Sequence, residues 1–152
     1  MSEMVVRWGV RSSLRDYIHS LADGSAWTDG GAVALADGRF EFTGPEFDPA
    51  ADSWRLVGSV HLRGHGGMLS LDVVDPCIEW AGNDAVLTVA DLDDPPERTP
   101  FVQLVGLGRD LSVPAARAVS THLTAIGAEL FLGNYREGMA FDPVEIILNE
   151  GA

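Results

Sequence analysis

The sequence contains no lysine, only one cysteine and no long apolar run. Its ten basic residues are therefore all arginines, and against 23 acidic residues they leave a formal net charge of -13 at pH 7. Because such a charge repels phosphates and anionic headgroups, we expect neither nucleic acid nor an anionic membrane surface to be a partner.

The single cysteine, Cys77, excludes an intramolecular disulfide, which fits a reducing compartment. Cys77 is therefore expected to be a small hydrophobic residue in the core. The lack of an apolar run of about 18 residues argues against a membrane-spanning helix. Residues 1–7 do not resemble a signal peptide either. The sequence as given therefore predicts a cytoplasmic protein with no membrane insertion.

The bulk composition is that of one globular unit. With 152 residues, of which 46% are hydrophobic, the chain can bury about two thirds of its unfolded surface around a single core. The 17 glycines indicate many turns. We therefore expect a single domain over residues 1–152.

Short apolar runs between glycine turns dominate the chain after residue 22. Residues 32–35 and 39–43 flank Asp37-Gly38, a dipeptide typical of β-hairpins. Residues 54–63 alternate between an apolar and a polar face, which predicts one continuous strand. Further strands are expected at residues 68–74, 77–80, 85–90, 101–107 and 144–148. The pattern predicts a mainly β fold, an antiparallel two-sheet β-sandwich with one or two short α-helices.

The first helix is expected at residues 13–21. Ser13 is the expected N-cap, with Asp16 three residues later in the position of a capping box. Apolar residues then recur at i, i+3, i+4 and i+7, namely at Leu14, Tyr17, Ile18 and Leu21. This stripe predicts that Tyr17 points into the body of the protein, where its hydroxyl needs a hydrogen-bond partner.

The segment 113–131 has features of both a strand and a helix. Residues 119–124 suit a strand, although the apolar residues of the whole segment also permit a helix. We expect a strand to about Thr124, followed by a short helix through Phe131.

Motifs of several common enzyme classes are missing: the sequence has no phosphate-binding loop, no Cys-x-x-Cys and no Gly-x-Ser-x-Gly. His61 and His65 form a His-x-x-x-His pair, but this spacing brings two rings together on a helix, not on a strand that enters a glycine turn. Zinc binding is therefore disfavoured, and His61 is interpreted as a solvated side chain. His19 and His122 are likewise expected at the surface.

His65 lies in Gly64-His65-Gly66-Gly67, where glycines allow a sharp turn that brings the imidazole close to another element. The residues alone leave two interpretations open: an ordinary turn histidine, or the partner of the Tyr17 phenol. Arg11 and Arg15, one helical turn apart, could bind carboxylates. They could equally form a solvated helix face with Asp16.

Five blocks of the chain, in their order and spacing, resemble the HtaA domain, the haem-binding module of bacterial surface haem-uptake systems. These blocks are residues 8–17, 47–48, 58–67, 123–128 and 135–143. No single block is decisive, but together they run nearly from end to end. The resemblance implies a two-sheet antiparallel sandwich with short helices.

The resemblance also implies a set of site residues. Matched by position, Tyr17 is the axial ligand to ferric haem, and His65 hydrogen-bonds to that ligand. Ser13 or Ser12 is the match for a serine that helps to form the pocket. Tyr135, the only other tyrosine, lies just before a turn. Substitution of Tyr135 is therefore the internal control for substitution of the expected ligand Tyr17.

The implied cofactor is haem b, whose ring needs an apolar cleft. Candidates for this cleft are Val10, Leu14, Ile18, Leu62 and Phe141. The haem propionates would face solvent or meet Arg11, Arg15 or Ser13.

The implied function is not enzymatic: the chain would bind ferric haem for uptake, transfer or storage, with a haem donor or acceptor protein as a further partner. Family members are usually exported or anchored at the cell surface. One alternative is a sandwich module that binds lipid or another apolar ligand without iron, with Tyr17 and His65 as a satisfied core pair. A peroxidase-like haem enzyme is disfavoured, because no distal acid–base set is visible beyond the histidine already used. The sequence does not predict the oligomeric state.

Overall fold

A computed structural model describes residues 2–44, 47–94, 96–109, 111 and 116–150. Its strands are β1 (Ser2–Trp8), β2 (Ser25–Asp29), β3 (Val33–Ala34), β4 (Phe40–Gly44), β5 (Phe47–Asp48), β6 (Ser53–Arg55), β7 (Ser59–Gly64), β8 (Leu69–Val74), β9 (Cys77–Ala81), β10 (Asp84–Ala90), β11 (Arg98–Val105), β12 (Ala116–Leu123) and β13 (Ala140–Glu150). Its helices are α1 (Ser12–Ser20), α2 (Ala125–Glu129) and the 3₁₀ turn η1 (His65–Gly67).

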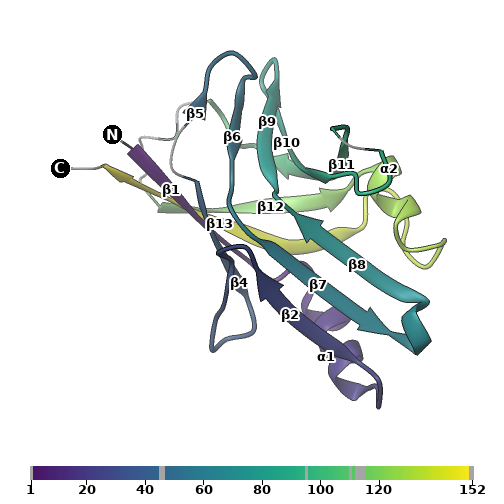
Figure 1. The fold of residues 1–152 in the computed structure, drawn as a ribbon. Coiled ribbons are helices and arrows are strands. Elements are labelled where there is room, and N and C mark those ends of the chain that lie inside the picture. The colour runs from purple at the N-terminus through teal and green to yellow at the C-terminus, as the bar shows by residue number, and fades with distance from the viewer. Residues whose placement is uncertain (1, 45–46, 95, 110, 112–115, 151–152) are drawn as a thin grey trace.

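The strands form two antiparallel sheets. The larger sheet has the order β3-β4-β1-β13-β12-β11-β10-β9-β6-β5, and the smaller one has the order β2-β7-β8. Figure 1 shows the smaller sheet as a separate layer, with α1 beside one end of it. The prediction of a mainly β, two-sheet antiparallel sandwich with short helices is confirmed.

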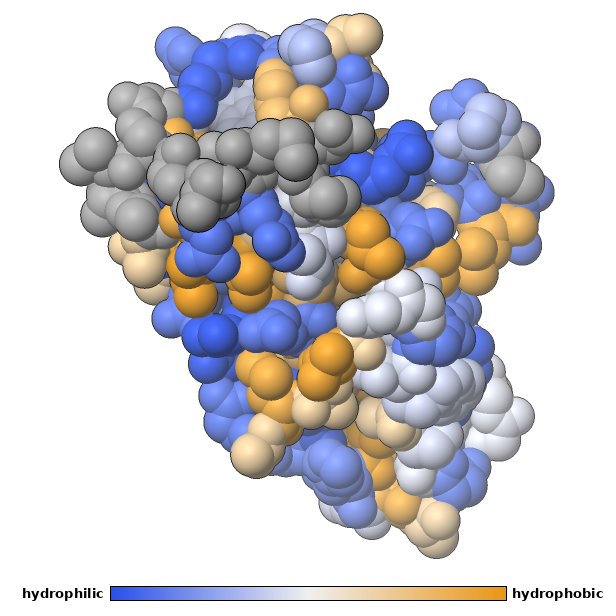
Figure 2. All heavy atoms as spheres, turned by 60° about the vertical axis from the view of Figure 1, so that its left-hand side comes forward, coloured by the Kyte–Doolittle hydropathy of each residue, from blue (hydrophilic) through white to orange (hydrophobic). Residues whose placement is uncertain are grey.

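The hydrophobic core joins both sheets and α1. Leu62 and Leu71 of the small sheet are buried in the same cluster as Trp8 of the large sheet and Leu14 of α1. Figure 2 shows one face of the molecule, on which hydrophilic residues are interspersed with smaller hydrophobic patches. Cys77 is buried as predicted, and burial raises the pKa of its thiol.

The continuous strand expected at residues 54–63 is divided between the two sheets, so this prediction is wrong. β6 belongs to the large sheet and β7 to the small one. Between them Gly58 has a φ of 120°, a conformation that favours glycine, and a Cβ at this position would lie 2.4 Å from the amide nitrogen of Ala32. The alternation therefore identifies the buried apolar residues correctly, although Ser59 of the polar face is buried too, and the backbone turns from one sheet into the other.

The hairpin expected around Asp37-Gly38 is present: β3 pairs antiparallel with β4, with Ala34 opposite Phe40. β2 was not predicted, because its five side chains are mostly exposed and show no apolar alternation. The change from strand to helix at Thr124 is confirmed, and the Thr124 side chain caps α2 by accepting from the Gly127 amide at 2.8 Å. Residues 113–115 of that segment lie outside the described residues.

Within the described part of the chain, no helix combines the length and apolar character needed to cross a membrane.

Candidate functional site

The start of α1 is held from the opposite end of the chain. Arg11 is the N-cap and makes no capping bond with its side chain, so the prediction of Ser13 as N-cap is wrong. Instead, Asp142 of β13 accepts a hydrogen bond from the Ser12 amide at 2.9 Å and pairs with Arg15 at 2.8 Å. Because free amides at a helix start need an acceptor, this carboxylate does the work of a cap and ties α1 to the large sheet.

Tyr17 lies on α1 but not on its buried face. Only Leu14 and Ile18 of this helix are buried, whereas the Tyr17 residue is 45% exposed. The prediction that Tyr17 points into the core is therefore wrong. The buried stripe of α1 follows an i, i+4 line, which leaves Tyr17 at its border, with the phenol free to reach the neighbouring turn.

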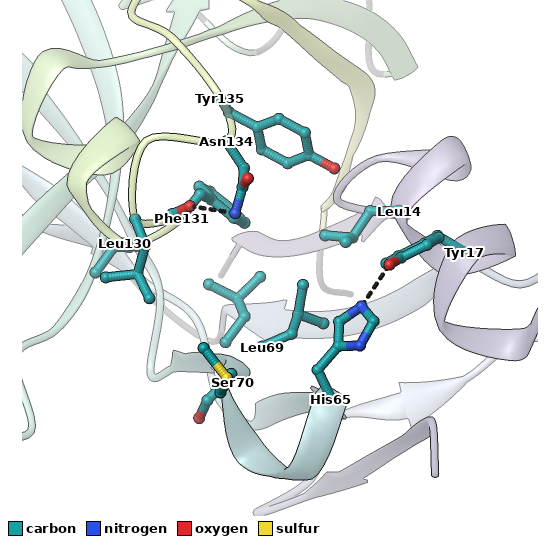
Figure 3. Close-up of a pocket in the computed structure, with 12 residues that line it drawn as sticks. Leu14, Tyr17, His65, Leu69, Ser70, Leu130, Phe131, Asn134 and Tyr135 are labelled. Atoms are coloured by element: carbon teal, nitrogen blue, oxygen red, sulfur yellow. Dashed lines mark hydrogen bonds between the residues drawn. The ribbon is translucent and has the colours of Figure 1, made fainter. Parts of the chain in front are cut away.

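The Tyr17 hydroxyl contacts Nε2 of His65, and the two ring centroids lie 5.4 Å apart. His65 comes from η1, the turn between β7 and β8, and has a φ of 53°, which is unusual for a residue with a side chain. Of the two interpretations of His65, the structure agrees with the one that pairs it with the phenol. Figure 3 shows the imidazole and the phenol meeting across the gap between the turn and the helix.

The pair lies at a cleft with a volume of about 610 Å³. Three segments form its walls: α1, the stretch from η1 into β8, and the loop after α2. The described lining residues are Leu14, Tyr17, His65, Met68, Leu69, Ser70, Leu71, Leu130, Phe131, Leu132, Asn134 and Tyr135. None of these carries a carboxylate or a guanidinium group, so the cleft is apolar apart from a few neutral polar groups, the phenols and the imidazole.

Tyr135 is a lining residue that the sequence analysis treated only as a control. Figure 3 shows it on the wall opposite His65, with its hydroxyl directed toward the cleft. Its ring packs against Phe131, with centroids 4.7 Å apart, and the Arg11 guanidinium lies 5.1 Å from the ring centroid. The sequence marks Tyr135 as a possible lining residue only through its place in block 135–143, because no helical or strand periodicity distinguishes this position.

The remaining predicted site residues lie beside the cleft and do not line it. Ser12 and Ser13 are exposed on the first turn of α1, and Arg11 donates to Ser13 Oγ and, at 3.4 Å, to the Ala140 carbonyl. Arg15 is engaged with Asp142. The binding roles of Arg11, Ser12 and Ser13 stay predictions.

Of the apolar residues expected to form the cleft, only Leu14 is found there. The other four, which are Val10, Ile18, Leu62 and Phe141, are buried in the core and are not among the described lining residues. The cleft wall is instead supplied by the loop after α2, whose conformation the sequence analysis did not predict.

His61 is not solvated, so its interpretation was wrong. Its side chain is 14% exposed and bridges Asp72 at 2.6 Å and Asp29 at 3.2 Å, while its ring stacks on Trp27 with centroids 5.0 Å apart. These contacts tie together all three strands of the small sheet, which carries the His65 turn. His19 and His122 are exposed as expected.

The donor groups of the cleft limit the ligands it can take. No group of three His, Cys, Asp or Glu side chains among the described residues could hold a metal ion. A metal held by protein alone usually needs three or four donors. The Tyr17 phenol, with its imidazole partner, supplies one oxygen donor at the cleft.

A family model described as Htaa matches residues 3–147. The chain belongs to the HtaA family. The match extends over α1, η1, β8 and the loop after α2, so all walls of the cleft lie within the HtaA region.

Solved HtaA domains share this fold. The N-terminal domain of HtaA from Corynebacterium glutamicum is 27% identical, with a TM-score of 0.76 and coverage of 99% of this chain and 98% of that one. The C-terminal domain of the same protein is 26% identical, with a TM-score of 0.68 and coverage of 97% of each chain. The haem-binding protein HtaB from that organism, at 20% identity, a TM-score of 0.68 and coverage of 99% and 98%, shows likeness of fold alone. No curated protein matches the chain.

Proposed function

We propose that this HtaA-family chain binds ferric haem in the cleft, with Tyr17 as the axial ligand and His65 as the hydrogen-bond partner of that ligand. The contact between the Tyr17 hydroxyl and His65 Nε2 at an apolar cleft carries the proposal. Haem b is the form that suits the chain, because the sequence lacks a Cys-x-x-Cys-His motif for covalent attachment.

The cleft fits a haem-sized ligand in both size and chemistry. Its volume of about 610 Å³ lies within the range of about 300–1,000 Å³ that is usual for cofactor sites. Leucine and aromatic side chains on its walls suit the face of a porphyrin, and Tyr17 supplies an oxygen donor at one side. Haem would supply the iron with four coordination positions already filled, so that one protein ligand suffices.

One hydrogen bond links the Tyr17 hydroxyl to Nε2 of His65, and its direction depends on which of the two groups carries the proton. While Tyr17 is a neutral phenol, its hydroxyl donates to Nε2 of neutral His65. An ordinary phenol titrates at about pH 10, so ligation at neutral pH requires loss of this proton. A protonated Nε2 can then donate back to the phenolate oxygen, which orients Tyr17 and tunes its donor strength.

The rim of the cleft supports a role in haem transfer or storage. Met68 and Leu132 on this rim are 77% and 74% exposed, an apolar surface that a haem donor or acceptor protein could cover. HtaB, which shares the fold, is named as a haem-binding protein.

The test is a titration of the apo protein with haemin, followed by absorption and resonance Raman spectroscopy. The parent should bind one equivalent and give a ferric phenolate spectrum. Tyr17→Phe should lose that spectrum and weaken binding by more than about 100-fold, and His65→Ala should weaken it by about 10- to 100-fold.

His122→Ala is the matched control, because His122 is an exposed histidine on β12 that does not line the cleft. It should bind haemin like the parent. Equal binding by the parent, Tyr17→Phe and His65→Ala would refute the proposal. If the parent does not bind haemin but co-purifies with lipid, the alternative of a lipid-binding module is correct.

A further inference from the structure

Asp23 contacts neither Tyr17 nor the cleft, yet its carboxylate is bound to the turn that carries His65. Oδ1 accepts a hydrogen bond from the His65 amide at 3.2 Å, and Oδ2 accepts one from the Gly66 amide at 2.6 Å. The bond from Gly66, followed by that from His65, lowers the pKa of Asp23 below its usual value despite partial desolvation. The carboxylate is thus ionised at neutral pH and holds two successive backbone amides.

The turn is short, and a backbone hydrogen bond from the Met68 amide to the His65 carbonyl closes it at 3.1 Å. His65, Gly66 and Gly67 have φ values of 53°, 63° and 92°, and all three residues are exposed. A Cβ on Gly66 or Gly67 would meet nothing within 4 Å, so there is open space beside both glycines. A left-handed conformation is unfavourable for a residue with a side chain, such as His65. The two hydrogen bonds that Asp23 accepts help to offset this strain.

We propose that Asp23 is a positioning residue that fixes the His65 turn so that Nε2 of His65 reaches the Tyr17 hydroxyl. Its place in the chain suits this role. Asp23 follows the end of α1 at Ser20 by three residues, so one short segment carries both the ligand tyrosine and the group that positions its partner. The significance of this arrangement for haem rests on the function proposed above, whereas the arrangement itself is a property of the apo protein.

The first test uses the apo protein and needs no haem. In ¹⁵N-edited NMR spectra the ring signals of His65, identified by their absence in His65→Ala, should move in Asp23→Ala toward those of the exposed His19 and His122. Asp23→Asn, which keeps the size of the side chain and one acceptor oxygen, should move them less. His65 ring signals that stay unchanged in Asp23→Ala would overturn the proposal, whatever the protein does with haem.

The second test measures haem loss to an excess of a haem-scavenging globin. Asp23→Ala should speed loss by about tenfold, in the range typical for partners of a metal ligand. The double variant Asp23→Ala/His65→Ala should lose haem no faster than His65→Ala, because Asp23 acts through His65. Additive effects in the double variant would show a merely structural role and overturn the proposal.

Asp48→Ala is the matched control for both tests. Asp48 likewise accepts two backbone amides in a turn, from Ala50 at 3.0 Å and Ala51 at 3.3 Å, but it belongs to β5 in the large sheet and does not line the cleft. It should leave the His65 signals and the rate of haem loss unchanged. If Asp48→Ala changed both as much as Asp23→Ala does, general loosening of the fold would be the explanation instead.

Discussion

The phenols and the imidazole of the cleft lie on opposite sides of it. Tyr17 of α1 and His65 of η1 form a hydrogen-bonded pair on one side of the cleft, whereas the ring of Tyr135 lies on the opposite side and packs against Phe131. Both tyrosines therefore line the same cleft. The contact with His65 distinguishes Tyr17 from Tyr135, because Nε2 of His65 is a hydrogen-bond partner for the Tyr17 hydroxyl.

Tyr135→Phe should keep the ferric phenolate spectrum that Tyr17→Phe loses. The variant retains the ring contact with Phe131 and the Arg11 guanidinium over its face, and removes only a hydroxyl that has no acceptor comparable to His65. Resonance Raman spectra of the two variants, loaded with haemin under the same conditions, provide the comparison. Loss of the phenolate bands in Tyr135→Phe alone would assign the ligand to Tyr135.

Asp72 gives a second prediction, on stability. Burial by itself would raise the pKa of Asp72, but hydrogen bonds from His61 and Arg63 outweigh it, and the pKa is lowered. A lowered pKa means that the carboxylate contributes stability above its unfolded-state value of about 3.9, and that this contribution is lost as the pH falls through the lower folded-state value.

Asp72→Asn should therefore reduce the free energy of unfolding by about 1–3 kcal/mol at pH 7. The difference from the parent should shrink as the pH falls below the unfolded-state value of about 3.9 and through the lowered folded-state pKa of Asp72, because the carboxylate is then protonated. Urea unfolding at pH 7 and over this acidic range measures this. A difference that is equal at pH 7 and in the acidic range would mean that the charge of Asp72 does not contribute.

At the level of elements, α1 is a nine-residue helix that depends on its surroundings. Helices of this length are marginal in isolation, so tertiary contacts must hold it. Leu14 and Ile18 bury its inner face, and Asp142 binds its first turn through Ser12 and Arg15. The position of Tyr17 thus depends on a carboxylate from the last strand of the chain.

Asp142→Ala should lower the free energy of unfolding by about 2–3 kcal/mol, because it removes the acceptor of the helix start and the carboxylate partner of Arg15, which keeps its hydrogen bond to the Gly9 carbonyl at 2.7 Å. Asp37→Ala is the control, since Asp37 also pairs with an arginine but its side chain is 54% exposed. That control should lose clearly less stability than Asp142→Ala, because solvent screens an exposed ion pair. Chemical denaturation followed by tryptophan fluorescence compares them, and equal losses would contradict the capping role.

Gly58 lies where the chain turns from β6 of the large sheet into β7 of the small sheet. Gly58→Ala should destabilise the fold by about 3 kcal/mol or more, since the new methyl group would collide with Ala32 in addition to the strained φ. Gly82→Ala is the control, because Gly82 also has a positive φ, 64°, but a Cβ there would meet nothing within 4 Å. This substitution should reduce the stability by only about 1 kcal/mol. Thermal unfolding of both variants checks this. Similar losses would show that the backbone conformation alone matters at Gly58.

At the scale of the whole molecule, the net charge of -13 affects the stability of the fold. The ion pairs of the structure are mostly exposed or half-exposed, and such pairs each contribute little. Repulsion among the excess carboxylates therefore outweighs them and opposes the compact state.

Raising NaCl from about 20 mM to about 500 mM should accordingly raise the Tm of the apo protein by a few degrees, because salt screens the repulsion. Scanning calorimetry at fixed pH measures the shift. Potassium chloride serves as a control for ion-specific effects. A Tm that falls with salt would show that attractive ion pairs dominate instead.

Much of the fold follows from local patterns. The period-2 runs that became β4 and β7–β10, the change to helix at Thr124 and the burial of Cys77 were all predictable, because a strand or a buried position leaves its mark on neighbouring residues. The order of the motif blocks also singled out Tyr17 and His65, which the structure brings together.

Sequence by itself thus determined the class of fold, the family and the two side chains that meet at the cleft. Only the tertiary structure decided that Tyr17 is exposed, that Asp142 caps α1, that Tyr135 closes the opposite wall and that Asp23 holds the His65 turn. The physical reason is the range of the interactions: helical and strand periodicity act over a few residues, whereas each of these features needs a contact between groups that lie far apart along the chain.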